Sequence, residues 1–174
     1  MRRIETASLT LEPQMAAHAE EMFAILSDPA IYAYENEPPA SIEWLRDRFV
    51  KLESRRSPDG QEQWLNWVIR LPDSKLIGYV QATVRANGGA AIAYVLSSAH
   101  GGRGLAWQAV HAMIGELAQR YQVRSLSAVF KCDNQRSRRL LERLGFSLAP
   151  SEEYVKHQVE AGELLMQRTI SVHE

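Results

Sequence analysis

The sequence is poor in the features that mark several large classes of protein. It has 174 residues but a single cysteine, so no disulfide can form within the chain and a reducing compartment is compatible with it. No apolar run approaches the roughly 18 to 20 residues that a membrane-spanning helix requires. The first residues also lack the apolar core of a signal peptide. We therefore expect a cytoplasmic protein with no membrane partner.

An excess of one charge is missing as well. The chain has 20 Lys and Arg residues against 21 Asp and Glu residues, so its net charge of −1 gives no long-range attraction for nucleic acid. The five histidines show no metal-ligand spacing, and we predict no metal site. Repeats and low-complexity tracts are absent from the sequence. With 45% hydrophobic residues, the composition predicts one globular domain over residues 1–174.

The most informative stretch lies between a strand-like run and a helix-like run. Ala90–Leu96 is short and mainly apolar, which is typical of a strand, and from Leu105 apolar residues recur at helical spacing. Three glycines, Gly101, Gly102 and Gly104, separate the two runs. The first amides of a helix have no partner inside it, and the helix dipole adds positive charge there. Glycines at this position favour a phosphate-binding loop.

Two well-known nucleotide-binding loops do not fit this stretch. The chain has no Gly-Lys-Ser/Thr triplet, which a Walker loop requires. A dinucleotide-binding fingerprint would need glycine in place of Trp107 and an acid about 20 residues further on, where Arg124 and Ser125 stand. A glycine-rich loop alone most often marks a turn, so the next segment decides the interpretation.

That segment predicts a strand followed by a short amphipathic helix. Residues 125–130 alternate polar and apolar side chains, Asn134 suits a helix N-cap, and Gly145 suits a helix end. With Ser137 three residues after Asn134, the chain now carries two motifs in a characteristic order. The motifs are Gly-x-Gly-x-Ala at 102–106 and Asn-x-x-Ser at 134–137, the latter followed by Leu-Gly-Phe at 144–146. Together they resemble the GNAT superfamily of acyl-CoA-dependent N-acyltransferases, closest to its Rim-type branch.

The resemblance implies an α/β fold. The expected architecture is a central mixed, mostly antiparallel sheet of about seven strands, flanked by about four helices, with one splayed strand pair that forms the CoA slot. It also implies acetyl-CoA as cosubstrate, with its pyrophosphate on the glycine-rich loop and its pantetheine arm beside the preceding strand. The cofactor-binding residues implied are Tyr94, Val95, Leu96, Gly101, Gly102, Arg103, Gly104, Leu105, Ala106 and Asn134.

The chemistry implied by the resemblance is direct attack of a primary amine on the thioester in a ternary complex. A backbone N–H near Leu96 meets the negative charge on the carbonyl oxygen, and loss of such a donor typically costs about 2.7–4 kcal/mol. Asn134 holds the pantetheine or a water. Ser137 is the candidate acid for the departing thiolate.

Three positions depart from the family pattern. Leu141 stands where many members have a tyrosine that protonates the departing thiolate, and Gly101 stands where Arg or Gln is usual. Residues 90–94 hold no carboxylate to act as a base, so a water chain or Glu35 or Glu37 is left for that role. These departures motivate an alternative function, a non-catalytic acyl-CoA-binding or sensing domain.

The acceptor is left open between a protein N-terminus and a small-molecule amine. Tyr34, Glu35 and Trp64 are the candidate substrate residues, because acidic and aromatic side chains suit a cationic amine, although core packing is an alternative for Trp64. Dimers are frequent in the family, so a homodimer is one alternative for the assembly.

The remaining pattern predicts the other elements. A strand is expected in 3–12, helices in 16–27 and from Ser41 to about Leu52, and a strand hairpin in 64–71 and 75–85. A final strand pair is expected in 147–155 and 163–172.

Overall fold

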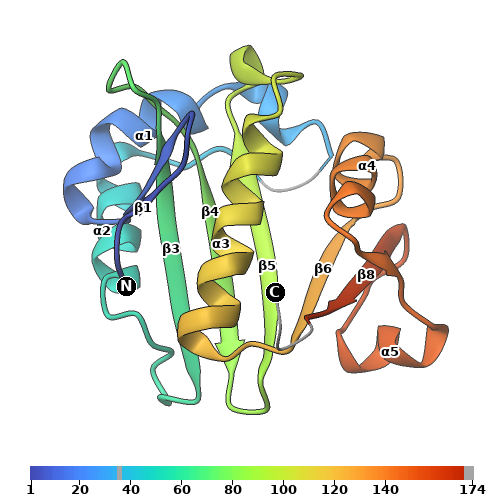
Figure 1. Ribbon diagram of the computed structural model, residues 1–174. Helices are drawn as coiled ribbons and strands as arrows, with labels where there is room; N and C mark the ends of the chain where they lie inside the picture. Colours follow the sequence, from blue (N-terminus) through green and yellow to red (C-terminus); the bar gives the residue numbers. More distant parts are fainter. Residues whose placement is uncertain (35–36, 171–174) are drawn as a thin grey trace.

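A single mixed sheet organises the computed structural model, which describes residues 1–34 and 37–170 (Figure 1). In these residues the sheet has eight strands in the order β1-β2-β3-β4-β5-β6-β8-β7. Every neighbouring pair is antiparallel except β5 and β6. The strands are β1 (Ile4–Glu5), β2 (Thr10–Pro13), β3 (Glu62–Arg70), β4 (Leu76–Arg85), β5 (Gly89–Leu96), β6 (Ser125–Lys131), β7 (Ser147–Leu148) and β8 (Glu163–Thr169). The predicted mixed, mostly antiparallel sheet is confirmed, with eight strands in place of about seven.

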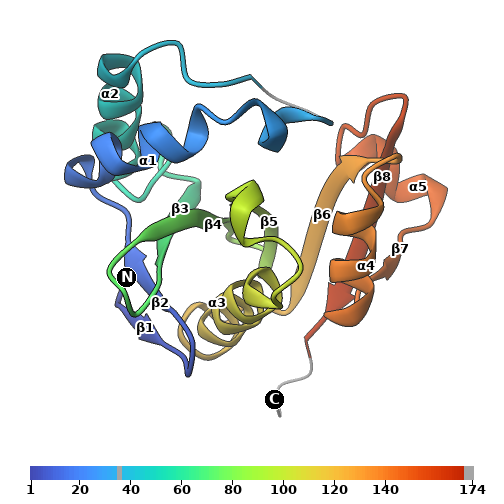
Figure 2. The ribbon, with the colours of Figure 1, turned by 90° about the horizontal axis from the view of Figure 1, so that it is seen from above.

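Helices cover both faces of the sheet (Figure 2). The α-helices in the described residues are α1 (Ala19–Leu26), α2 (Ile42–Leu52), α3 (Leu105–Tyr121), α4 (Gln135–Arg143) and α5 (Ser151–Lys156). Short 3-10 helices are η1 (Ala16–His18), η2 (Pro29–Tyr32) and η3 (Ser98–His100). Helices α1 and α2 lie on one face and α3 on the other, while α5 lies against β8, where the Tyr154 hydroxyl accepts the Leu165 amide at 3.3 Å.

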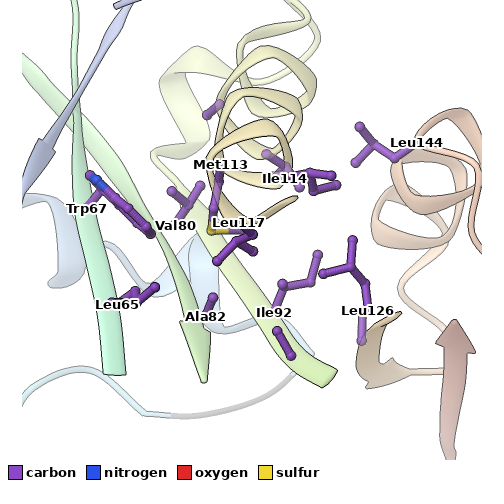
Figure 3. Packing of buried hydrophobic residues seen from close by; sticks show 14 of the residues in the cluster. Leu65, Trp67, Val80, Ala82, Ile92, Met113, Ile114, Leu117, Leu126 and Leu144 are labelled. Atoms are coloured by element: carbon purple, nitrogen blue, oxygen red, sulfur yellow. The ribbon is translucent and has the colours of Figure 1, made fainter. Parts of the chain in front are cut away.

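Side-chain alternation along the strands builds a separate core on each face. On the α3 face, Val80 and Ala82 of β4 pack in one cluster with Met113 and Leu117 of α3, which point toward the strands in Figure 3. Leu144, just after α4, joins the same cluster. On the opposite face, α1 and α2 form a second, smaller cluster around residues such as Met22, Leu45, Phe49 and Val68. The central strands of the sheet therefore pack against helices on both faces.

The strand predicted in 3–12 was wrong in one respect, because it is a hairpin of β1 and β2. The Thr6 hydroxyl donates to the Leu9 carbonyl oxygen at 2.9 Å and accepts the Leu9 amide at 3.1 Å. These bonds close a turn in the middle of the predicted strand.

The strand predicted in 147–155 was also wrong beyond its first two residues. Pairing with β8 stops after Leu148, and α5 begins at Ser151. Pro150 has no amide to donate to a ladder, and the acidic residues Glu152 and Glu153 favour the start of a helix. By contrast, α2 begins as predicted, with the Ser41 hydroxyl accepting the Trp44 amide at 3.0 Å.

Candidate functional site

The two parallel strands at the centre of the sheet separate along their length. β5 and β6 pair only at Gly89–Ala91 with Ser125–Ser127, and from there the strands diverge (Figure 1). β5 nevertheless stays paired with β4 as far as Leu96, which lies opposite Gly78. Val95 and Leu96 therefore have no β6 residue opposite them. The predicted splayed strand pair is confirmed.

A bulge in β4 lies opposite the end of β5, where β5 and β6 are already unpaired. Ile69 of β3 is opposite Gly78 and Arg70 is opposite Leu76, so Ile77 is an extra residue in β4. A Cβ built on Gly78 would lie 2.0 Å from the Val95 carbonyl oxygen, so only glycine allows this close approach of β4 to β5. Bulges bend a strand and increase its twist, which turns β5 away from β6.

Gly78 was missed by sequence reasoning. The signal that could have found it is an isolated glycine inside an otherwise regular strand pattern, which indicates a bulge or a close backbone approach.

The glycine-rich loop presents backbone amides at the start of α3. Gly102 and Gly104 have φ angles of 76° and 73°, in the left-handed region that favours glycine, and both are exposed. Gly104 is the N-cap of α3, and its carbonyl oxygen accepts the Gln108 amide at 3.1 Å. Within the described residues, the amides from Gly102 to Trp107 donate to no backbone or side-chain acceptor. They are therefore available to an anion.

The basic residues of α4 differ in their surroundings. One guanidinium nitrogen of Arg136 lies 4.0 Å from the position of a Cβ built on Gly101, so this side chain reaches the glycine-rich loop. Arg138 instead pairs with Glu142 at 3.0 Å. Of these two arginines, Arg136 is the one placed to neutralise an anion on the loop, together with the exposed Arg103.

The second motif faces β5 across the separated strands. The Asn134 side-chain oxygen accepts the Ser137 amide at 3.1 Å, so Asn134 is the N-cap of α4. The Tyr94 hydroxyl donates to the Ser137 carbonyl oxygen at 3.5 Å, which brings residues of the two motifs together. Leu141 is only 1% exposed and belongs to the core, whereas the phenol that does reach α4 comes from β5.

Among the described residues, no hydrogen bond or ring contact joins the predicted substrate residues Tyr34 and Trp64. Tyr34 is exposed, Glu35 lies outside the described residues, and Trp64 is half-buried on β3, where its indole nitrogen donates to Glu62 at 3.2 Å. The segment before Tyr34 is tied to the end of β5, because the Ser98 hydroxyl donates to the Asp28 carboxylate. That bond, followed by the Ala30 amide, holds the pKa of Asp28 below its usual value.

The described residues contain neither a group of metal ligands nor a membrane-spanning helix. No three His, Cys, Asp or Glu side chains in 1–34 and 37–170 gather into a group that could hold a metal ion. None of the helices in this part of the chain combines the length and the apolar character that crossing a bilayer requires.

Comparison with known proteins agrees with this geometry. The model of a GNAT acetyltransferase domain matches residues 8–147, whereas no curated protein sequence matches the chain. A solved structure of RimL, a ribosomal L7/L12 alpha-N-protein acetyltransferase in complex with coenzyme A, is 19% identical with a TM-score of 0.80, covering 98% of this chain and 99% of that one.

Two further solved structures have the same fold. The ribosomal-protein-S5-alanine acetyltransferase of Vibrio fischeri is 16% identical with a TM-score of 0.75, covering 96% of each chain. The microcin C7 self-immunity acetyltransferase MccE, in complex with acetyl-CoA and AMP, is 19% identical with a TM-score of 0.72, covering 95% of this chain and 94% of that one.

Proposed function

Because the chain belongs to the GNAT acetyltransferase family, we propose that it moves an acetyl group from acetyl-CoA to a primary amine by direct attack in a ternary complex. The observation that carries this proposal is the coincidence of two features. Unpartnered amides at the start of α3 lie next to a strand, β5, whose far end has no β6 residue opposite it. We extend the proposal to a cytoplasmic single-domain enzyme, as a monomer or a homodimer.

The glycine-rich loop is suited to hold the pyrophosphate of the cosubstrate. Its amides have no competing acceptor, and no described atom lies within 4 Å of a Cβ built on Gly102 or Gly104, so the approach is open. Arg103 and Arg136 supply positive charge beside it. In this proposal the contacts to the cosubstrate come from Tyr94, Val95, Leu96, Gly101, Gly102, Arg103, Gly104, Leu105, Ala106 and Asn134.

The reaction needs a site for negative charge and a path for two protons. Acetyl-CoA supplies the acetyl thioester, and the acceptor nitrogen forms a bond to its carbonyl carbon as the carbon–sulfur bond breaks. The Leu96 amide stabilises the charge on the carbonyl oxygen. The amine loses a proton to water. Ser137 passes its proton to the departing thiolate as it takes one from water, so its hydroxyl is restored; this hydroxyl has no hydrogen-bond partner among the described residues.

Asn134 can cap α4 and bind the cosubstrate at the same time. Its side-chain oxygen is used by the Ser137 amide, while its NH₂ group has no partner in the described chain and can donate to a pantetheine carbonyl or a water. The acceptor is a protein N-terminus or a small-molecule amine, with Tyr34 and Trp64 as the described candidates for its contacts.

A second candidate function is a non-catalytic acyl-CoA-binding or sensing domain. The observation that favours it is the burial of Leu141 in the core, because this residue cannot donate a proton to the departing thiolate. Turnover distinguishes the two candidates, because both require the same CoA site.

The test combines calorimetry with CoA and a thiol-release assay with acetyl-CoA and a panel of amines and peptides. We expect binding and release, and we expect Ser137→Ala to lower kcat about 10-fold to 100-fold while KM for acetyl-CoA changes little. Ser147→Ala, an exposed serine of β7, is the control. Binding without turnover would favour the sensing domain, and absence of binding would contradict both candidates.

A further inference from the structure

A polar groove lies on the face of the sheet opposite α3, between α2 and the strands β3 and β4. It has a volume of about 310 Å³. Its lining combines the polar and charged residues Arg48, Lys51, Asn66, Gln81 and Thr83 with the apolar residues Leu52, Trp64 and Ala82. Helix α2 and helix α3 lie on opposite sides of these strands in Figure 2, so this groove is distinct from the glycine-rich loop at the start of α3.

The neutral polar side chains of the groove have no partners of their own. Asn66 is 7% exposed, yet its side-chain amide forms no hydrogen bond with any described residue. The same is true of the Gln81 amide and the Thr83 hydroxyl. None of these side chains has an unpaired polar atom that is fully buried, so their free donors and acceptors can be reached by water or by a ligand. The groove therefore has unused hydrogen-bonding capacity on two neighbouring strands.

The two cations of the groove are not neutralised either. Neither Arg48 nor Lys51 is within ion-pair distance of a described carboxylate, and Arg48 lies over the Trp44 ring at 5.6 Å. Glu62, the acid of β3, is already engaged by Arg85 and by the Trp64 indole, each at 3.2 Å. The groove thus carries unpaired positive charge next to unpaired polar groups, which is an environment for an anion.

The strand register places this groove in line with the site of acetyl transfer. Gly78 lies opposite Leu96, whereas Gln81 and Thr83 lie opposite Ala93 and Ala91, three and five residues further along β4. At about 3.3 Å per residue, the groove therefore extends from about 10 Å to about 17 Å beyond the level of Gly78. Gln81 and Thr83 alternate with the core residue Ala82, so they face α2. Between them and the strand separation, Ala91 and Ala93 offer only small, partly exposed side chains.

We propose that this groove binds an acidic side chain of the acceptor, and that the acceptor is the amino terminus of an extended peptide. This inference rests on the proposed acetyl transfer and deepens it. A chain of about four or five extended residues spans the distance from the thioester to the groove. Arg48 and Lys51 then pair with the carboxylate, while the Asn66 and Gln81 amides satisfy its remaining oxygen lone pairs.

The groove favours an acceptor whose charge differs from the one that the acidic loop suggested. Glu35 and Glu37 suggested a cationic amine, whereas the groove favours a substrate that is negatively charged beyond its reacting amine. A polyamine has no anionic group for the groove and would leave Arg48 and Lys51 unpaired.

The test compares kcat/KM for three C-terminally amidated peptides that differ only at the fourth residue. Peptides of sequence Ala-Ala-Ala-X-Ala, with X as Glu, Gln or Lys, are offered with saturating acetyl-CoA. We expect the Glu peptide to be preferred to the Lys peptide about 10-fold at low salt, with a smaller preference at high salt. In the double variant Arg48→Gln and Lys51→Gln, we expect the preference to fall to within about twofold.

Controls separate the groove from the rest of the enzyme. Arg46→Gln removes a cation from the same helix, but one that pairs with Glu20 outside the groove, so the preference is expected to remain. CoA binding by calorimetry should be unchanged in all variants. Equal kcat/KM for the Glu and Lys peptides, or a preference that survives in the double variant, would overturn the groove proposal alone. Failure to bind CoA or to acetylate any amine would overturn the proposed function as well.

Discussion

The two edges of β6 behave in opposite ways, although they belong to one strand of seven residues. On one edge β6 pairs with β8 along its whole length, from Ser125 to Lys131. On the other it pairs with β5 for only three residues. Strand propensity cannot explain this difference, because the same residues form both edges. The difference arises from the neighbours of β6.

The closed edge is held by buried side chains. Leu165 and Met166 of β8 are 0% and 1% exposed, and Leu126 and Phe130 of β6 are similarly buried. The open edge faces β5, whose far half is committed to β4 through the bulge at Ile77 and Gly78. One edge thus serves stability and the other leaves space for a ligand. The variants below change one edge of β6 or its surroundings at a time, so that the roles of the two edges can be measured separately.

The largest effect is expected for Gly78→Val. A Cβ at this position would lie 2.0 Å from the Val95 carbonyl oxygen, so β4 and β5 must move apart. We expect a loss of about 3 kcal/mol in the free energy of unfolding and CoA affinity at least about 10-fold weaker. Urea unfolding and calorimetry measure the two effects.

Gly115→Ala is the matched control for that variant. Gly115 lies inside α3, and no described atom lies within 4 Å of a Cβ built on it. Alanine should therefore stabilise the protein by about 1 kcal/mol and leave CoA affinity unchanged. A Gly78→Val protein that binds CoA like the wild type would show that the bulge does not shape the site.

Leu165→Ala tests the closed edge. Removing a fully buried leucine from β8 is expected to cost about 3 kcal/mol of stability. Because the open edge is untouched, the CoA affinity of the folded protein should stay within about twofold of the wild type. A larger loss of affinity at temperatures where the variant is fully folded would show that the two edges are coupled.

Gly104→Ala tests the loop rather than the strands. At a φ of 73°, alanine is strained, and we expect about 1–2 kcal/mol of lost stability and CoA affinity about 10-fold weaker. Gly60→Ala introduces the same strain at a φ of 71° in the loop before β3 and should leave affinity unchanged. If both variants bind CoA equally well, the loop amides are not part of the site.

The smallest effect is expected for Asp28→Asn at the start of η2, where the carboxylate accepts a hydrogen bond from the hydroxyl of Ser98, just after β5. Hydrogen bonds from the Ser98 hydroxyl and the Ala30 amide keep the pKa of Asp28 below its usual value. The folded protein therefore holds this carboxylate ionised more firmly than the unfolded chain does. The stabilisation is complete above the unfolded pKa of about 3.9 and is lost as the pH falls through the lower, folded value.

Asp28→Asn should remove this part of the acid dependence of the unfolding temperature, measured from about pH 5 to pH 2.5, and weaken CoA binding by at most about threefold. Asp59→Asn is the comparison, because Ser57 lowers the pKa of Asp59 in the same way in the loop before β3. It should change the acid dependence alone. Equal effects of both variants on CoA affinity would show that the tie between Asp28 and Ser98 does not support the site.

Sequence reasoning succeeded where one short stretch determines the structure. Residues 90–96 and 105–121 form the predicted strand and helix, and Asn134 and Ser41 are helix caps, because each pattern depends only on close neighbours. The family motifs then supplied the order of elements and the strand separation.

The features that were missed depend on contacts between distant segments. The need for glycine at Gly78 comes from β5, whose carbonyl oxygen leaves no room for a side chain. The polar groove combines α2, β3 and β4, and only the register brings Asn66 opposite Gln81. The hairpin at Thr6 and the helix after Pro150 were missed because the apolar periodicity was read through residues that favour turns.

The most direct test of the CoA site is an NMR titration of the ¹⁵N-labelled protein with CoA, following backbone amide shifts residue by residue. We expect the largest changes in the amides from Gly102 to Trp107, together with those of Val95 and Leu96. Saturable binding that leaves these amides unshifted, with the changes in another part of the molecule, would contradict this expectation.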